Sequence, residues 1–99
     1  MATTNREELL AILRPLKPEL TARYKVREIA LFGSFVRGEG EEASDVDLLV
    51  DFEDGADLFD LVRLALFLEG ELQRKVDVIS RRALRTEFRD AVLREAVPL

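Results

Sequence analysis

Residues 31–38 read Leu-Phe-Gly-Ser-Phe-Val-Arg-Gly, and residues 44–50 read Ser-Asp-Val-Asp-Leu-Leu-Val. The first stretch is the end of an apolar strand followed by a Gly-Ser turn. The second is an apolar strand that opens with two aspartates. Side chains alternate between the faces of a strand, so Asp45 and Asp47 share one face, with carboxylates roughly 6–7 Å apart. Two negative charges that close repel each other, and a divalent cation such as Mg²⁺ relieves the repulsion.

The turn between the two strands has the composition of a phosphate-binding site. Gly33 lacks a Cβ, so a phosphate can approach the backbone closely. The N–H groups of a short helix expected over residues 34–38 favour an anion. Ser34 adds a hydroxyl donor and Arg37 a guanidinium. The sequence therefore predicts Gly33, Ser34 and Arg37 as nucleotide-binding residues.

Each of these residues also has a purely structural interpretation. Gly33 can form a tight turn, Ser34 can cap a helix and Asp45 can cap a loop. Arg37 can pair with Asp45 or with Glu41. The combination of all these residues with two acids on one strand face favours a nucleotide and metal site over the separate structural roles.

Composition narrows the chemistry further. The 99 residues suggest one domain with one core. The absence of histidine and cysteine excludes a histidine base, a Ser-His-Asp triad, disulfides and cysteine-ligated zinc. A net charge of −5 argues against direct binding of nucleic acid. The sequence contains neither a signal peptide nor an apolar run of the ~20 residues that a membrane span needs, which predicts a cytoplasmic protein without membrane contact.

Together, Gly33-Ser34, Arg37-Gly38 and Ser44-Asp45-Val46-Asp47 resemble the signature of the DNA polymerase beta-like nucleotidyltransferase superfamily. Within it, the short chain resembles the minimal nucleotidyltransferases, the MNT antitoxins paired with HEPN-domain toxins. The resemblance implies a polymerase-beta-like palm, formed by one domain over residues 1–99. It also implies a third acid on a later strand. Asp77, in the strand-like run of residues 75–79, is the acid in that position.

What this resemblance implies about function is an antitoxin enzyme. Asp45, Asp47 and Asp77 would be its catalytic residues and would bind Mg²⁺. ATP would donate AMP to a hydroxyl, that of a tyrosine of the partner HEPN toxin. The chain has no room for a second substrate domain, so the acceptor docks from another molecule or the chain oligomerises. The alternative is a non-catalytic nucleotide-binding module that neutralises its partner by sequestration.

The whole sequence predicts a two-layer α/β (α+β) fold with a small mixed sheet and helices on one face. Strands are expected over residues 26–32, 45–52 and 75–80. The first helix is expected to begin with a capping box at Thr4 and Glu7 and to end or kink at Pro15, and a second to begin at Pro18. A further helix is expected to follow Asp57, and a last one to run from Ser80 or Arg81 to Ala96.

The helix over residues 57–72 has an unusually wide apolar surface. Its expected core stripe is Leu58, Leu61, Val62, Ala65 and Leu72. Further apolar residues widen the arc beyond the ~100° of an ordinary surface helix. Either the helix is wedged between the sheet and other helices, or it carries a partner or oligomer surface that includes Phe59 and Phe67. Burial of both phenylalanines in the core of a monomer would exclude the partner surface.

Overall fold

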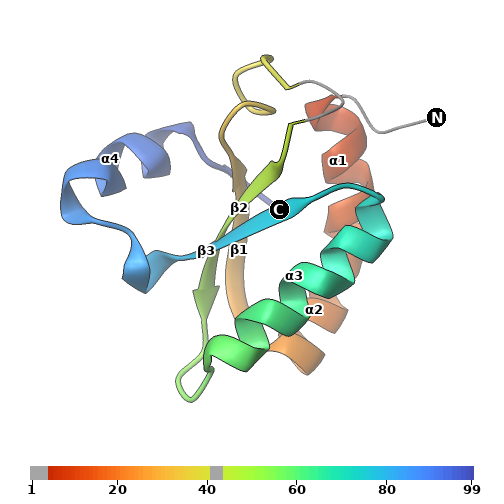
Figure 1. Ribbon diagram of the computed structural model, residues 1–99, viewed down its shortest axis with the longest axis vertical. Coiled ribbons are helices and arrows are strands. Elements are labelled where there is room, and N and C mark those ends of the chain that lie inside the picture. Colours follow the sequence, from red (N-terminus) through yellow and green to blue (C-terminus); the bar gives the residue numbers. More distant parts are fainter. Residues whose placement is uncertain (1–4, 41–43) are drawn as a thin grey trace.

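The computed structural model describes residues 5–40 and 44–99, and within these ranges four strands form one mixed sheet in the order β3-β2-β1-β4 (Figure 1). The strands are β1 (Val26–Phe32), β2 (Val46–Phe52), β3 (Val76–Ser80) and β4 (Val97–Pro98). β1 is antiparallel to β2 and to β4, whereas β2 and β3 are parallel. A parallel pair needs a crossover connection, which α3 (Leu58–Leu72) provides. The predicted mixed sheet with flanking helices is confirmed.

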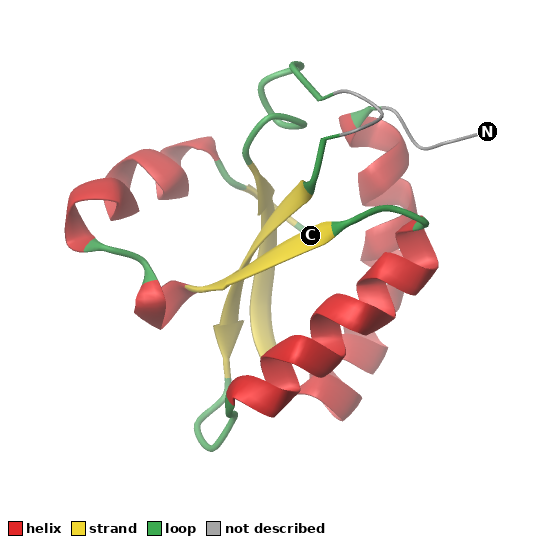
Figure 2. Ribbon diagram, in the orientation of Figure 1, coloured by secondary structure: helices red, strands yellow, loops and turns green. Residues whose placement is uncertain are grey.

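The helices lie on both sides of this sheet (Figure 2). On one side are α1 (Arg6–Leu13), α2 (Lys17–Tyr24) and α3. On the other side is α4 (Thr86–Glu95), so the expectation of helices on one face is wrong for α4. The physical reason is that the second face also carries buried apolar residues, Phe32 and Leu49, which need cover. Leu93 of α4 lines a cavity together with Leu49.

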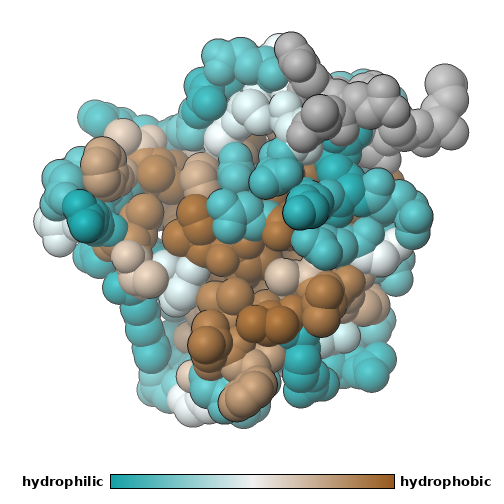
Figure 3. Space-filling view, in the orientation of Figure 1, coloured by the Kyte–Doolittle hydropathy of each residue, from teal (hydrophilic) through white to brown (hydrophobic). Residues whose placement is uncertain are grey.

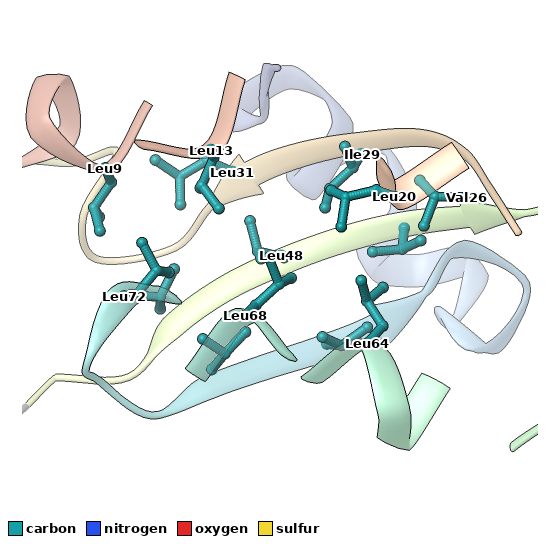
Figure 4. Packing of buried hydrophobic residues seen from close by; sticks show 14 of the residues in the cluster. Leu9, Leu13, Leu20, Val26, Ile29, Leu31, Leu48, Leu64, Leu68 and Leu72 are labelled. Atoms are coloured by element: carbon teal, nitrogen blue, oxygen red, sulfur yellow. The ribbon is translucent and has the colours of Figure 1, made fainter. Parts of the chain in front are cut away.

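The core lies between the sheet and the first three helices (Figure 4). Leu31 and Leu48 are fully buried neighbours on β1 and β2, and their side chains point toward leucines of the helices. Fully burying one such side chain contributes about 1.5–3 kcal/mol. The fully buried leucines of the helices are Leu9, Leu13, Leu20, Leu64 and Leu68. This packing fixes which face of β2 is left for Asp47.

The two N-terminal helices begin and end close to the predicted positions, but the residue that caps the first helix is different. Asn5 caps α1, because its side-chain oxygen accepts a hydrogen bond from the Glu8 N–H at 2.9 Å. The predicted cap, Thr4, lies outside the described residues. The predicted break at Pro15 is confirmed, since α1 ends at Leu13 and a 3₁₀ turn, Arg14–Leu16, follows. Pro18 stands in the first turn of α2, as predicted.

Two further expectations about helices are wrong. Residues 34–38 form hydrogen-bonded turns rather than a helix, with the N–H groups of Val36 and Arg37 both donating to the Gly33 carbonyl. The last helix begins at Thr86, not at Ser80 or Arg81. A 3₁₀ turn, Arg81–Ala83, is followed by extended backbone at residues 84–85, which interrupts the helical hydrogen bonds.

The buried face of α3 differs from the predicted stripe. Asp57 and Asp60 form a capping box, in which the Asp57 carboxylate accepts from the Asp60 N–H at 3.1 Å and the Asp57 N–H donates to the Asp60 carboxylate at 3.0 Å. This box holds Asp60 inward, within 3.5 Å of Lys25. The residues at four-residue steps from Asp60 are therefore buried: Leu64, Leu68 and Leu72. Leu58 and Val62 of the predicted stripe lie on the exposed side instead.

The two phenylalanines of α3 have different environments. Phe59 is 77% exposed. Phe67 is half-buried and stacks on the Tyr24 ring, with 5.2 Å between ring centroids. The condition that would exclude a partner surface is therefore not met. Within the described part of the chain, each helix is too short or too polar to cross a membrane.

Candidate active site

The Gly-Ser turn lies directly beside the second aspartate of β2. In the antiparallel β1–β2 pair, Phe32 is opposite Asp47, so Gly33 follows β1 at the point where Asp47 stands on β2. Gly33 has a φ of +82°, in the left-handed region, and a Cβ there would collide with the Asp47 carboxylate. Glycine is required here both by the backbone and by the close approach of the carboxylate.

Asp77 lies on the same side of the sheet as Asp47. In the parallel β2–β3 pair, Asp47 and Asp77 are register partners, and residues in register on neighbouring strands point to the same face. Asp45 stands one residue before β2 rather than within it as expected, and is exposed, as is Asp77. Asp47 is half-buried. The structure thus brings the three predicted acids to one edge of the sheet, and their role stays a prediction.

The three carboxylates are close enough to influence one another, but not closed into a chelating group. Burial raises the pKa of Asp47, and the negative charges of Asp77 and Asp45 raise it further. Among residues 5–40 and 44–99, no three acidic side chains stand within reach of one metal ion. Since carboxylates without a cation repel each other, the exposed Asp45 and Asp77 side chains would have to rotate toward Asp47 to chelate one.

Arg37 pairs with acids other than those the sequence suggested. Its Nε donates to Glu39 at 2.8 Å, and its Nη1 donates to Glu95 at 2.7 Å. Glu41, one of the suggested partners, lies outside the described residues. Ser34 is half-buried in the same turn, and its carbonyl accepts from the Glu39 N–H at 2.9 Å. The positive charge of Arg37 offsets part of the rise in the pKa of Asp47, so Arg37 belongs to the same electrostatic site.

Glu95 is a residue of this site that the sequence reasoning missed. One of its carboxylate oxygens accepts from Arg37, and the other accepts from the Gly33 N–H at 3.1 Å. The hydrogen bond from Arg37 lowers the pKa of Glu95 most, against the effect of burial. Glu95 is 62 positions from Gly33 along the chain. Its signal in the sequence is that of an ordinary helix-terminal acid, and only the fold brings it to the turn.

Two cavities flank the site. One, of about 360 Å³, lies on the α4 side of the sheet and is lined by residues that include Ala30, Leu49 and Leu93. The other lies on the outer side of the turn, where Arg37 and Phe35 contribute to its walls. Among the described residues that line these two cavities, Asp45, Asp47 and Asp77 do not appear. They occupy an open edge, which a large acceptor can reach.

Comparison with known proteins gives a consistent result. The family described as the nucleotidyltransferase domain matches residues 13–99. The chain is 45% identical over 97 residues to the protein adenylyltransferase MntA of Thermococcus cleftensis, covering 98% of each chain. A solved structure described as a minimal nucleotidyltransferase has a TM-score of 0.82 and 48% identity, covering 93% of this chain and 94% of that one.

A less similar solved structure contains a nucleotide analogue and a toxin-antitoxin pair. It is a toxin-antitoxin complex with AMP-PNP, and one of its chains matches with a TM-score of 0.71 and 27% identity. The match covers 91% of this chain and 70% of that chain. The family match over residues 13–99 includes β1, β2 and β3, which are the elements that carry the predicted site.

Proposed function

Because the chain belongs to the nucleotidyltransferase domain family, we propose that it transfers AMP from ATP to a hydroxyl of a partner toxin and acts as its antitoxin. The near full-length similarity to a protein adenylyltransferase supports the group that is transferred. The likeness to a toxin-antitoxin complex with AMP-PNP supports both the nucleotide and the kind of partner. The observation that carries the proposal is the placement of Gly33 against Asp47, with Asp77 in register on the same face.

The donor set suits Mg²⁺. Oxygen ligands from one or two carboxylates, completed by phosphates and water, are what Mg²⁺ takes in proteins. The pKa of Asp47 is raised first by burial and then by the negative charges of Asp77 and Asp45, and a bound cation would offset that repulsion. We assign Asp45, Asp47 and Asp77 as the ligands. When bound, Mg²⁺ would neutralise phosphate charge and polarise the reacting oxygens.

The chain's own residues then have distinct roles. The Gly33 N–H, the Ser34 hydroxyl and the Arg37 guanidinium bind the outer phosphates of ATP. Asp77, which is exposed, accepts the proton of the acceptor hydroxyl. The hydroxyl oxygen forms a bond to the α-phosphorus, and the bond from that phosphorus to the pyrophosphate oxygen breaks. The products are the AMP ester of the acceptor and pyrophosphate. The proposed acceptor is a tyrosine of a HEPN-domain toxin.

This function is tested by incubating the chain with a HEPN toxin, ATP and Mg²⁺ and measuring the intact mass of the toxin. We expect a mass increase of one or more AMP units, and none when the toxin tyrosine is replaced by phenylalanine. A toxin that forms a complex with the chain but keeps its original mass would contradict transfer. That result would leave the non-catalytic alternative.

The alternative, neutralisation by sequestration, is favoured by one observation. Four apolar side chains of α3 form an exposed stripe, here called the α3 apolar surface: Leu58, Phe59, Val62 and Leu66, which are 72%, 77%, 45% and 63% exposed. Figure 3 shows apolar residues gathered over α3 on this side of the molecule. Contiguous exposed apolar surface of this kind is typical of protein interfaces. We propose that this surface binds the toxin, whether or not AMP is transferred.

Replacing Phe59 by aspartate is expected to weaken the complex with the toxin by about 10-fold or more, as for a central aromatic residue of an interface. The fold should be retained, because the side chain is 77% exposed. Calorimetric titration and circular dichroism would measure the two effects. Phe88→Asp is the matched control, since it makes the same substitution at an exposed phenylalanine of α4, outside the α3 apolar surface. Equal affinities for both variants would contradict the assignment.

A further inference from the structure

Glu95, at the end of α4, places its carboxylate against the turn that is proposed to bind phosphate. Glu95 is the last residue of α4, and the chain then pairs with β1 as β4, placing Val97 opposite Leu31. The two Glu95 oxygens take separate donors, the Gly33 N–H at 3.1 Å and the Arg37 guanidinium at 2.7 Å. These are two of the groups assigned above to the nucleotide. A carboxylate bound in this way imitates two oxygens of a phosphate.

We propose that Glu95 is an internal competitor of the nucleotide, whose carboxylate occupies the place of a phosphate group and must leave before ATP binds. This inference rests on the proposed function, since it takes the turn as the phosphate site. The Gly33 N–H has one hydrogen and donates one strong hydrogen bond at a time, so Glu95 and a phosphate cannot both hold it. Release of Glu95 is therefore a step in nucleotide binding.

Charge gives the competition a second basis. Glu95 places a negative charge at the Gly33 turn, which lies against the Asp47 carboxylate. An incoming triphosphate carries further negative charge to the same place. Withdrawal of Glu95 releases the Nη1 of Arg37, whose Nε stays paired with Glu39, and removes one repulsive charge. Both changes favour the nucleotide.

The element that carries Glu95 is lightly held. Every residue of α4 is exposed or half-buried, and Phe88 is 55% exposed. β4 has only the residues Val97–Pro98, and the Leu99 N–H donates to the Ile29 carbonyl at 3.1 Å just beyond it. Segments with few buried apolar contacts open at low free-energy cost. Withdrawal of the α4 end is thus compatible with an intact core, which lies on the other face of the sheet.

Two substitutions test the competition. Glu95→Gln keeps the size of the side chain and removes its charge, and Glu95→Ala removes both acceptors. We expect either variant to bind AMP-PNP with Mg²⁺, and inorganic tripolyphosphate alone, about 10-fold more tightly than the wild-type chain, since a competing charged hydrogen bond is lost. Calorimetric titration measures the affinity of each variant for both ligands. Glu87→Gln is the matched control, because it removes the same charge from an exposed position of α4.

The two ligands separate this inference from the proposed function. If the Glu95 variants bind both ligands no more tightly than the wild-type chain, the proposed competition is wrong. The proposed function is still supported in that case, provided that the wild-type chain binds AMP-PNP. Tighter tripolyphosphate binding without any AMP-PNP binding would support the competition and contradict the nucleotide site. Failure of every variant to bind either ligand would contradict both. The NMR signal of the Gly33 amide should shift in both Glu95 variants and stay in place in Glu87→Gln.

Discussion

Asp47→Asn is expected to lower the rate of AMP transfer by about 10²–10³-fold, the usual cost of removing one group that stabilises transition-state charge. Asp47 is the half-buried member of the three acids and lies against Gly33. Asparagine has nearly the same shape but lacks the negative charge that a cation needs. The rate is measured as AMP incorporated into the toxin over time. Binding of the toxin should not change, because the α3 apolar surface lies on another element.

The stability of this variant distinguishes a lost charge from a lost fold. The pKa of Asp47 is raised in the folded chain, so the ionised carboxylate destabilises the fold once the pH exceeds the unfolded value. The neutral amide of Asp47→Asn removes that cost, and we expect the melting temperature at neutral pH to be unchanged or higher.

Asp51→Asn is the matched control for the rate. Asp51 lies on the same face of β2 as Asp47 and is also half-buried. Its carboxylate is 4.0 Å from the Arg27 guanidinium, away from the Gly33 turn. Transfer rates that fall equally in the two variants would show that the effect of Asp47 is not specific to the site. Neutralisation of the toxin by Asp47→Asn at the wild-type level would favour sequestration.

Gly33→Ala is expected to weaken nucleotide binding and to lower the transfer rate by about 10²-fold or more, because it removes productive alignment of the phosphates. An alanine Cβ would collide with the Asp47 carboxylate, and the φ of +82° costs about 1–2 kcal/mol for a residue other than glycine. The collision displaces the carboxylate that the site depends on. Calorimetric titration with AMP-PNP and thermal unfolding measure the two consequences.

Gly38→Ala separates backbone strain from the collision. Gly38 also has a positive φ, of +76°, but a Cβ there would meet open space. Both variants should therefore lose a similar part of their stability through the backbone, and only Gly33→Ala should also displace the carboxylate. A Gly38→Ala chain that loses transfer as completely as Gly33→Ala would show that backbone strain in the turn, and not the contact with Asp47, explains the loss.

The strands and their acids were predictable because their signals are local. Alternation along β2 puts Asp47 on the face opposite to the buried Val46 and Leu48, and the continuous apolar run that ends at Phe32 marks β1. Asp45, also expected within the strand, lies one residue before it. The register that pairs Phe32 with Asp47 brings Gly33, the next residue, against the Asp47 carboxylate. The position of Asp77 required the resemblance to a family, since a single acid on a strand carries no information about its neighbours.

Other features depend on contacts between distant parts of the chain. The capping box at Asp57 and Asp60 sets which face of α3 turns inward, and a count of apolar residues does not contain that information. After α4, on the opposite side of the sheet, the chain returns to β1 as β4, a two-residue strand with a proline that no periodic pattern predicts. Glu95 reaches Gly33 only as a result of that path. The missed residue and the missed strand thus have one cause.

The most direct test is titration of the wild-type chain and Asp47→Asn with AMP-PNP, each with and without Mg²⁺. If acids converging beside the Gly33 turn hold a metal and a triphosphate together, Mg²⁺ strengthens binding to the wild-type chain and has little effect on Asp47→Asn. Binding that depends on Mg²⁺ to the same extent in both chains would contradict this shared site.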